Sequence, residues 1–393
     1  MRWRRRGESD APLLSVVVPV FDVEDYLPAA LDSVLAQTHA RLEVVVVDDG
    51  STDSSGAVAD DYAARDERVR VVHTANHGLG AARNEGLRHA RGELVAFLDS
   101  DDAVPATAYA TLLGALASSG SDFVTGSIRQ WSPTPSPDPR PDGRPDGRPD
   151  ERPAEPGEPP WMRRLHNPPR HGIRAVEHPE ILGDVFAWNK VFRRSFWDAA
   201  YLAWPEGVRY EDQPTTTRAF LAGRFDVLPD VVYHWRIRTD GSSITQQRSS
   251  VRDLTDRLAT KRMALASVAA YDDPETSRVF LERVLAGDLH RYFAEIPGCS
   301  EEWWELLRSG IAEMWGRHSL VHSGLPPVHR LTGWLVEQGR RDDAAAVMAY
   351  AAALAPQPLP RVDDGRAPRL DLAALPDLTD VPLAAVALRP HEL

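Results

Sequence analysis

The sequence predicts an α/β fold with a mostly parallel central sheet, followed by a C-terminal helical domain. Two observations predict it. Between residues 14 and 125, short runs rich in β-branched residues alternate with stretches of helical periodicity, a pattern typical of right-handed crossovers in a parallel sheet. From about residue 251 to 355 strand signals vanish, and apolar residues recur at helical spacing.

The individual elements follow from these runs in chain order. We expect strands at residues 14–18, 44–47, 69–72, 94–98 and 123–125, and helices at about 25–37, 53–65, 78–90 and 106–118. Further along, a helix over about 214–222 and a strand over 231–237 are predicted, and the stretches 254–270 and 276–294 are helical.

Domain boundaries follow from changes in composition. Residues 132–160 hold 11 of the 32 prolines and too few apolar groups to offset the entropy of ordering, so we expect a flexible insertion there. The expected organisation is a flexible N-terminus (1–10), an α/β domain (11–250) interrupted by that insertion, a helical domain (251–355) and an extended tail (356–393). The helical domain is a candidate for engaging a substrate, for oligomerisation or for docking a partner, and packing of its apolar faces against the α/β domain is the favoured alternative.

Charge and composition exclude several classes of protein. With 45 basic and 58 acidic residues the chain carries a net charge of −13, which disfavours nucleic-acid binding. The longest apolar run, residues 344–355, is too short to span a membrane. A single cysteine, Cys299, and the absence of a signal-peptide pattern favour a cytoplasmic protein. The arginines at positions 2 to 6 suit a solvated terminus better than contact with an anionic membrane, the alternative reading.

Polar residues follow the first two predicted strands where those strands end. In open parallel sheets ligands bind beyond the carboxyl ends of the strands, which places Pro19 to Asp22 and Asp48 to Asp53 in the binding crevice. An aspartate there can accept a hydrogen bond from a ribose hydroxyl or a base N–H. For Asp53 the alternative, capping the helix that begins near Ser54, is favoured.

A glycine- and alanine-rich helix entry runs from Asn76 to Gly86 and carries Arg83 one turn in. Small residues let backbone N–H groups approach a phosphate, and an arginine can add a charge-assisted contact. The spacing matches neither a dinucleotide fingerprint nor a Walker loop, so those two kinds of site are excluded.

Three carboxylates, Asp99, Asp101 and Asp102, follow the fourth predicted strand. They repel one another unless donors or a cation compensate them. Hard oxygen ligands suit Mg²⁺ or Mn²⁺ shared with a diphosphate, so the sequence predicts a divalent metal site. The alternative, a helix N-cap before Pro105, fits Asp102 but leaves Asp99 and Asp101 without a role.

Together these motifs resemble the family 2 glycosyltransferases of the GT-A fold, the nucleotide-diphospho-sugar transferase fold. The matching segments are Val18-Pro19-Val20-Phe21, Asp48-Asp49-Gly50-Ser51-Thr52-Asp53, Asn76 with Gly80-Ala81-Ala82-Arg83-Asn84, and Asp99-Ser100-Asp101-Asp102. The resemblance implies that Asp101 ligates the metal, that Asp99 reaches the ribose or its neighbourhood, and that Ser100 is among the residues that bind the nucleotide sugar. It also implies that the uridine end of a nucleotide sugar is held by Pro19, Phe21, Asp49, Asn76 and Arg83. Asp22 stands where the family usually has asparagine.

The resemblance resumes after the insertion, at Trp188-Asn189-Lys190-Val191-Phe192 and Tyr210-Glu211-Asp212-Gln213. These segments are similar to those of transferases that extend bacterial cell-surface polymers, including teichoic acids. It implies that Asp212 is the general base, that Glu211 binds the acceptor and that His234 completes the metal site. Helix-terminal charge is the alternative for the acidic pair. Arg236, Arg238 and Ser243 are candidates for stabilising the leaving diphosphate. Core packing is favoured over sugar stacking for Trp188 and Trp204.

The resemblance therefore implies a metal-dependent inverting glycosyltransferase that moves a sugar, from a UDP-sugar by expectation, to a polysaccharide, teichoic-acid-like or lipid-linked acceptor. A nucleotidyltransferase is the alternative within enzymes, although the acidic segment after the first strand lacks the basic, glycine-rich loop expected of it. An inactive glycan-binding scaffold is the alternative outside enzymes. The presence of Asp99, Asp101, Asp212 and His234 argues against it.

Overall fold

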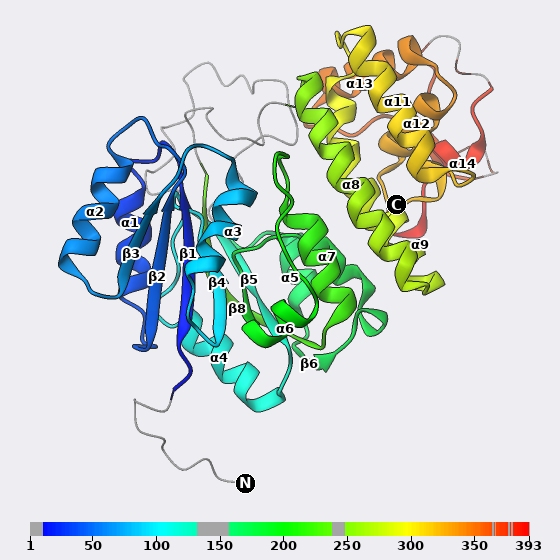
Figure 1. Cartoon of the computed structure of the whole chain (residues 1–393). Helices are drawn as coiled ribbons and strands as arrows, with labels where there is room; N and C mark the ends of the chain where they lie inside the picture. Colours follow the sequence, from blue (N-terminus) through cyan, green and yellow to red (C-terminus); the bar gives the residue numbers. More distant parts are fainter. Residues whose placement is uncertain are drawn as a thin grey trace. The chain divides into compact units, whose positions relative to one another are not determined.

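The computed structural model describes residues 11–131, 157–237 and 248–392, except 364, 366, 376, 377 and 379. The expected flexible N-terminus, the expected insertion up to residue 156, and the candidate residues Arg238 and Ser243 lie outside the described residues. The described residues form two compact units (Figure 1), one built around a large sheet and one helical, with a long helix between them in sequence.

The sheet unit contains eight strands in the order β3-β2-β1-β4-β7-β5-β8-β6. The pairings make β1 to β5 and β8 parallel to one another, with β6 and β7 antiparallel to them. The strands are β1 (Leu14–Val20), β2 (Leu42–Asp48), β3 (Val69–His73), β4 (Leu94–Phe97), β5 (Phe123–Trp131), β6 (Arg170–Ile173), β7 (Lys190–Arg193) and β8 (Phe225–Arg236). The predicted, mostly parallel α/β fold is thereby confirmed.

Helices cover both faces of this sheet, which is why its strands are apolar on both sides. They are α1 (Leu27–Leu35), α2 (Ser55–Arg65), α3 (Leu79–His89), α4 (Ala108–Ser119), α5 (Pro160–His166), α6 (Arg194–Ala199) and α7 (Asp212–Ala222). Val44 and Val46 belong to a core cluster that includes buried residues of α1 and α4. Val45 and Val47 point the other way and cluster with Ala82 of α3. The alternation along β2 thus fixes which helix lies on which face.

Four elements between the predicted insertion and α7 did not follow from the sequence pattern, namely α5, β6, β7 and α6. Each is only four to seven residues long. Such lengths give too few turns or alternations for periodicity to be legible. At the end of the predicted insertion, the carbonyl of Gly157 accepts a hydrogen bond from the backbone N–H of Gln130 on β5.

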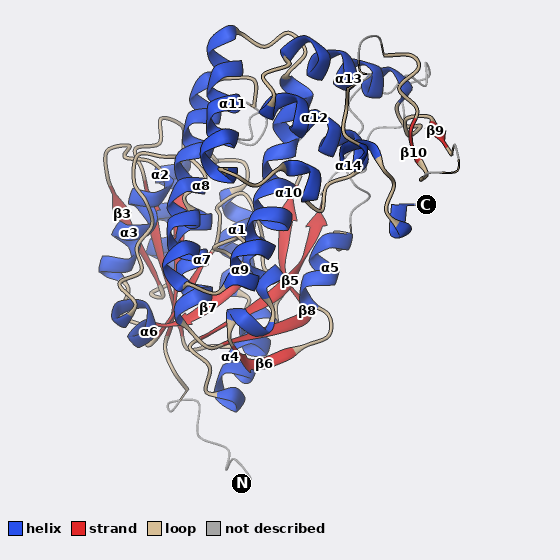
Figure 2. Ribbon diagram, turned by 90° about the vertical axis from the view of Figure 1, so that its right-hand side faces the viewer, coloured by secondary structure: helices blue, strands red, loops and turns tan. Residues whose placement is uncertain are grey.

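The helical unit confirms the expected C-terminal helical region. Its helices are α8 (Val251–Tyr271), whose last residues group with the sheet unit, α9 (Pro274–Val279), α10 (Ala286–Leu289), α11 (Glu301–Trp315), α12 (Pro327–Glu337) and α13 (Arg341–Leu354). The segment expected as an extended tail holds a hairpin of β9 (Arg361–Val362) and β10 (Arg369–Leu370), then α14 (Leu383–Val386) (Figure 2). Trp303, Trp304 and Trp315 are buried. Among the described helices, none is long and apolar enough to cross a membrane.

Candidate functional site

The predicted motifs meet at one edge of the sheet, where β1, β2, β4 and β8 end. The backbone N–H of Asp49, just after β2, donates to the carbonyl of Val20 on β1 over 2.9 Å. Ala103, after β4, exchanges two backbone hydrogen bonds with His234 on β8, at 2.9 and 3.2 Å. Loops far apart in sequence therefore form one site.

The expected base-binding residues lie around the carboxylate of Asp49. This side chain is buried and accepts from the backbone N–H groups of His77 at 2.9 Å and Gly78 at 2.8 Å. Phe21 is 45% exposed, unusual for so large an apolar side chain, and Asn76 is exposed as well. An exposed aromatic ring and an exposed amide are groups that a planar base can contact. Binding of the base by Phe21, Asp49 and Asn76 stays a prediction.

Gly50 lets the loop after β2 approach the loop after β3. Its φ is +75°, in the left-handed region. A Cβ there would also lie 2.8 Å from the backbone nitrogen of Asn76. Pro19, the remaining residue expected near the base, is buried within β1.

Asp48 and Asp53 organise loops. Asp48 accepts from the backbone N–H of Ser51 at 3.0 Å and lies 2.9 Å from Nδ1 of His73. Asp53 accepts from the backbone N–H of Ser55 at 2.9 Å, at the start of α2. Asp53 thus accepts from the first N–H of α2 as the capping interpretation expects, although the N-cap position itself is Ser54, and its other oxygen accepts from the backbone N–H of Glu24 at 3.0 Å.

Arg83 is the centre of the site. Its guanidinium, 1% exposed, pairs with Asp99 at 2.7 Å and with both Glu211 and Asp212. It thus joins α3, the end of β4 and the start of α7. The ring of Trp204 lies 5.2 Å from the guanidinium carbon. The expected contact of Arg83 with the nucleotide sugar stays a prediction, because in this structure three carboxylates accept from its two terminal nitrogens.

Burial decides the protonation of this cluster. It raises the pKa of Glu211 to about 8, with Arg83 opposing the shift and the charge of Asp212 adding to it. Burial likewise raises the pKa of Asp99 to about 6, although the positive charge of Arg83 acts to lower it. Burial therefore favours the protonated form of Glu211.

The acidic turn after β4 divides its carboxylates between different partners. Asp102 is buried and accepts from the Tyr233 hydroxyl at 2.8 Å and from the backbone N–H of Arg236 at 2.6 Å. The same hydroxyl accepts from the backbone N–H of Asp99 at 3.2 Å. The alternative interpretation of Asp102 as a helix cap was wrong. Its carboxylate instead links the turn after β4 to two residues of β8. Ser100 is buried in the turn.

Asp101 and His234 are the two residues expected to ligate a metal. Within the described part of the chain, no group of three or more His, Cys, Asp or Glu side chains is arranged to hold a metal ion. Mg²⁺ and Mn²⁺ shared with a diphosphate need only one or two protein ligands. Burial lowers the pKa of His234, with Arg129 adding to the effect, so its ring is neutral and keeps a lone pair. The donor set therefore fits a cation whose remaining ligands come from substrate.

Arg236 lies between two aromatic rings beside the acidic turn. Its guanidinium carbon is 5.2 Å from the ring of Tyr26 and 4.3 Å from that of Trp131. Its Nε donates to the backbone carbonyl of Asp101 at 2.6 Å. Contact with a leaving diphosphate stays a prediction for this residue.

Two buried tryptophans near the site pack as expected. Trp188 stacks on Tyr233 with ring centroids 3.9 Å apart and on Phe186 at 4.4 Å. Trp204 meets Phe97 edge to face at 4.9 Å. Both belong to the core of the sheet unit.

Sequence reasoning missed two buried charged residues behind the site, Asp184 and Lys190. Both side chains are fully buried and paired at 2.9 Å. One feature of the sequence indicates this pair. Lys190 stands next to the apolar residues Val191 and Phe192, where burying an ammonium without a partner would be costly.

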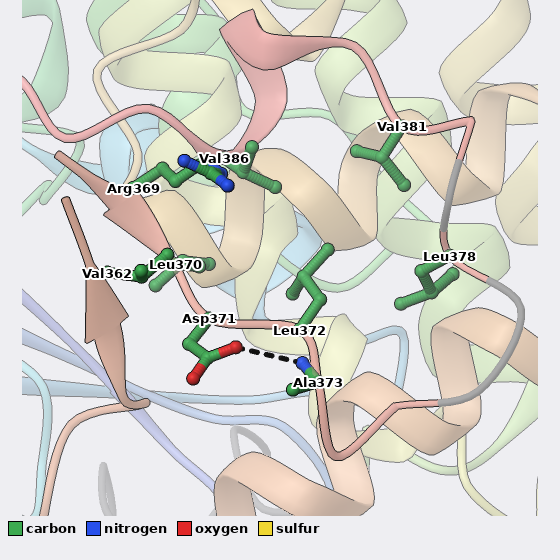
Figure 3. Close-up of a pocket in the computed structure, with 9 residues that line it drawn as sticks. All are labelled: Val362, Arg369, Leu370, Asp371, Leu372, Ala373, Leu378, Val381 and Val386. Atoms are coloured by element: carbon green, nitrogen blue, oxygen red, sulfur yellow. Dashed lines mark hydrogen bonds between the residues drawn. The ribbon is translucent and has the colours of Figure 1, made fainter. Parts of the chain in front are cut away.

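In the helical unit, a cavity of about 280 Å³ lies between the β9–β10 hairpin and α14 (Figure 3). Seven of its nine lining residues are Val, Leu or Ala. The carboxylate of Asp371 accepts from the backbone N–H of Ala373 at 2.9 Å and is thereby satisfied. None of the expected site residues lines it.

Comparison with known proteins agrees with the family that the sequence motifs resemble. Residues 15–198 match the family described as glycosyl transferase family 2. The chain is 32% identical over 239 residues to the uncharacterised glycosyltransferase EpsJ of Bacillus subtilis, covering 57% of this chain and 61% of EpsJ. It is 32% identical over 242 residues to the putative glycosyltransferase EpsH of the same organism, covering 61% and 64%. The match thus spans less than two thirds of either relative.

The structure is also similar to that of TarS from S. aureus (residues 1–349) in complex with UDP-GlcNAc. The TM-score is 0.64 at 19% identity, over 91% of this chain and 96% of that chain. At this identity the likeness concerns the fold.

Proposed function

We propose that the protein, whose residues 15–198 match glycosyl transferase family 2, transfers a sugar from a nucleotide sugar, specifically a UDP-sugar, to a hydroxyl group of a cell-envelope glycan. The observation that carries the proposal is the Arg83 cluster. It places Asp99, expected to face the donor, next to Glu211 and Asp212, expected to face the acceptor.

The chemistry assigned to the chain is a single displacement at the anomeric carbon. The oxygen of the acceptor hydroxyl bonds to the anomeric carbon while Asp212 takes the proton of that hydroxyl. The bond between this carbon and the diphosphate breaks on the opposite face of the sugar, which inverts the configuration. Side-chain exposure of 18% leaves the Asp212 carboxylate partly open, as a base must be. Glu211, whose protonated form is favoured by burial, is the residue assigned to bind the acceptor.

Asp101 and His234 are the residues that would hold a divalent cation, Mn²⁺ or Mg²⁺. When bound, such a cation offsets charge developing on the diphosphate. Phe21, Asp49 and Asn76 bind and orient the base. A cell-surface polysaccharide as acceptor is supported by relatives such as the putative teichuronic acid biosynthesis glycosyltransferase TuaG of Bacillus subtilis, 45% identical over 92 residues, 23% of this chain and 36% of TuaG.

The test is to incubate the purified full chain with Mn²⁺ and a panel of nucleotide sugars and to measure release of the nucleoside diphosphate. We expect slow hydrolysis of one UDP-sugar and none of the others. Absence of turnover with every donor, in protein that is folded and binds no UDP, would contradict the proposal.

A further inference from the structure

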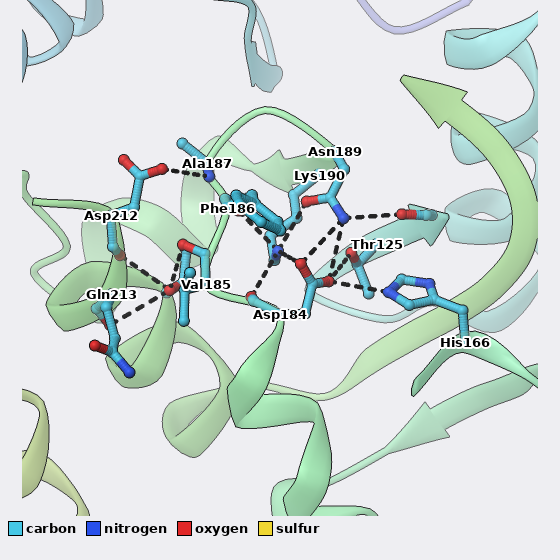
Figure 4. A network of polar contacts seen from close by, with 12 residues as sticks. Thr125, His166, Asp184, Val185, Phe186, Ala187, Asn189, Lys190, Asp212 and Gln213 are labelled. Atoms are coloured by element: carbon cyan, nitrogen blue, oxygen red, sulfur yellow. Dashed lines mark hydrogen bonds and ion pairs between the residues drawn. The ribbon is translucent and has the colours of Figure 1, made fainter. Parts of the chain in front are cut away.

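The loop before β7, residues 184–189, lies against the proposed base. The backbone N–H of Ala187 donates to Oδ2 of Asp212 over 3.2 Å, while Arg83 pairs with Oδ1 (Figure 4). The hydroxyl of Thr216, one turn along α7, lies 3.1 Å from the carbonyl of Val185, and its one proton is shared between that carbonyl and those of Asp212 at 2.9 Å and Gln213 at 3.3 Å. Both oxygens of Asp212 are thus held, one of them by a loop amide.

This loop is held from within by the ammonium of Lys190. Its Nζ donates to the carbonyls of Asp184 at 3.0 Å and Phe186 at 2.8 Å, and to Oδ1 of Asn189 at 2.9 Å. It also pairs with the Asp184 carboxylate. One side chain therefore fixes the backbone on both sides of Val185, and Ala187 follows directly (Figure 4).

Asp184 anchors Lys190 to the sheet. Its carboxylate accepts from the hydroxyl of Thr125 at 2.6 Å and from Asn189 at 3.1 Å, and lies 3.2 Å from Nε2 of His166. Burial alone would raise the pKa of Asp184, but Lys190 and His166 lower it, so the carboxylate stays ionised. A fully satisfied buried network of this kind holds its members in one arrangement.

Stabilising the fold is one consequence of such a pair, yet hydrophobic residues of similar volume often serve that purpose as well or better. What an apolar pair lacks is donors for the two loop carbonyls. The charge of Lys190 also acts electrostatically on Asp212. From these contacts we infer that Lys190, held by Asp184, is a positioning residue for Asp212: it shapes the 184–189 loop so that the Ala187 amide orients the base. The inference rests on the proposed function.

The main test compares Lys190→Met with Lys261→Met in the full chain, using the UDP-sugar that the wild type consumes. Lys261 is an equally buried lysine paired with Asp288 in the helical unit, so it controls for loss of a buried ion pair. We expect kcat for UDP release to fall 10- to 100-fold in Lys190→Met, with donor KM and UDP Kd within twofold of wild type. Lys261→Met should lose stability but keep its kcat. Unchanged kcat in folded Lys190→Met overturns the inference.

Thr216→Val decides the question if Lys190→Met fails to fold. It removes the hydroxyl that reaches the Val185 carbonyl, together with the bonds of that hydroxyl to the carbonyls of Asp212 and Gln213 within α7. The matched control is Thr217→Val on the same helix, whose buried hydroxyl has no hydrogen-bond partner in the part of the chain described. A kcat reduced several-fold in the first variant and not in the second supports the inference, and equal kcat values overturn it.

Two measurements separate this inference from the proposed function. Asp212→Asn with full activity would defeat the proposed function, whereas inactive Asp212→Asn beside fully active Lys190→Met would defeat the positioning role alone. Hydrogen exchange needs no turnover. We expect the Ala187 amide to exchange at least tenfold faster in Lys190→Met or Thr216→Val than in wild type, and an unchanged rate contradicts the inference.

Discussion

Arg83 and Asp99 form an ion pair of 2.7 Å in which the guanidinium is almost completely buried. The same guanidinium pairs with Glu211 and Asp212. One positive charge on α3 therefore connects the end of β4 with the start of α7. We expect the arrangement of the site to depend on this charge.

Replacing Arg83 removes the cation that three carboxylates share. We expect Arg83→Gln to lower the free energy of unfolding by about 3–5 kcal/mol, as when one partner of a buried pair is lost. Arg83→Lys should rescue little, because an ammonium lacks the planar fork that reaches several carboxylates. Urea denaturation measures both.

The control is Arg88→Gln on the same helix, an exposed arginine paired with Glu85. Exposed pairs contribute about 0–1 kcal/mol, so this variant should resemble wild type. Equal effects at Arg83 and Arg88 would show that the buried cluster is not held by its cation.

Glu211 makes stability depend on pH. Its pKa is raised from 4.5 to about 8, so between these values the folded protein holds a proton that the unfolded chain lacks. The contribution is complete below about 4.5 and is lost as pH rises through about 8. One proton corresponds to a fall in unfolding free energy of about 1.4 kcal/mol per pH unit.

Glu211→Gln should flatten that decline, because an amide does not titrate. Urea denaturation at several pH values from 5 to 9 measures it, with Glu305→Gln, an exposed glutamate paired with Arg308, as control. Identical pH dependence in wild type and Glu211→Gln would contradict the assignment of the proton.

The metal site predicts metal-dependent nucleotide binding. Asp101→Ala and His234→Ala should each weaken UDP binding in the presence of Mn²⁺ and leave the weaker binding without metal unchanged. Calorimetry of UDP with and without a chelator measures this, and His318→Ala, at an exposed histidine of the helical unit, is the control. UDP affinity independent of metal in all four proteins would exclude a shared site.

Much of the sheet unit follows from local sequence. The runs around Val16, Val45 and Val95 predict strands because buried parallel strands are apolar on both faces. Aspartates placed directly after such runs must lie at the binding edge, which located Asp49 and Asp101.

What could not be predicted depends on contacts between distant residues. Arg83 and Glu211 are 128 positions apart, and nothing local marks the arginine as the partner of the acidic pair. Asp102 satisfies the local rules for a helix cap, yet its oxygens bond to Tyr233 and Arg236, more than 130 residues away. A buried Lys190 contradicts the usual exposure of lysine until its partner Asp184 is known.

The central claim is that Asp212 is the general base, and Asp212→Asn tests it most directly. The measurement is kcat for UDP release alongside UDP affinity by calorimetry, with Asp198→Asn, an exposed aspartate paired with Arg194, as the control. The account predicts that kcat falls by about 10²–10⁴ in Asp212→Asn, the range for loss of general-base catalysis, while UDP affinity stays within twofold. Near-normal kcat in folded Asp212→Asn would contradict it.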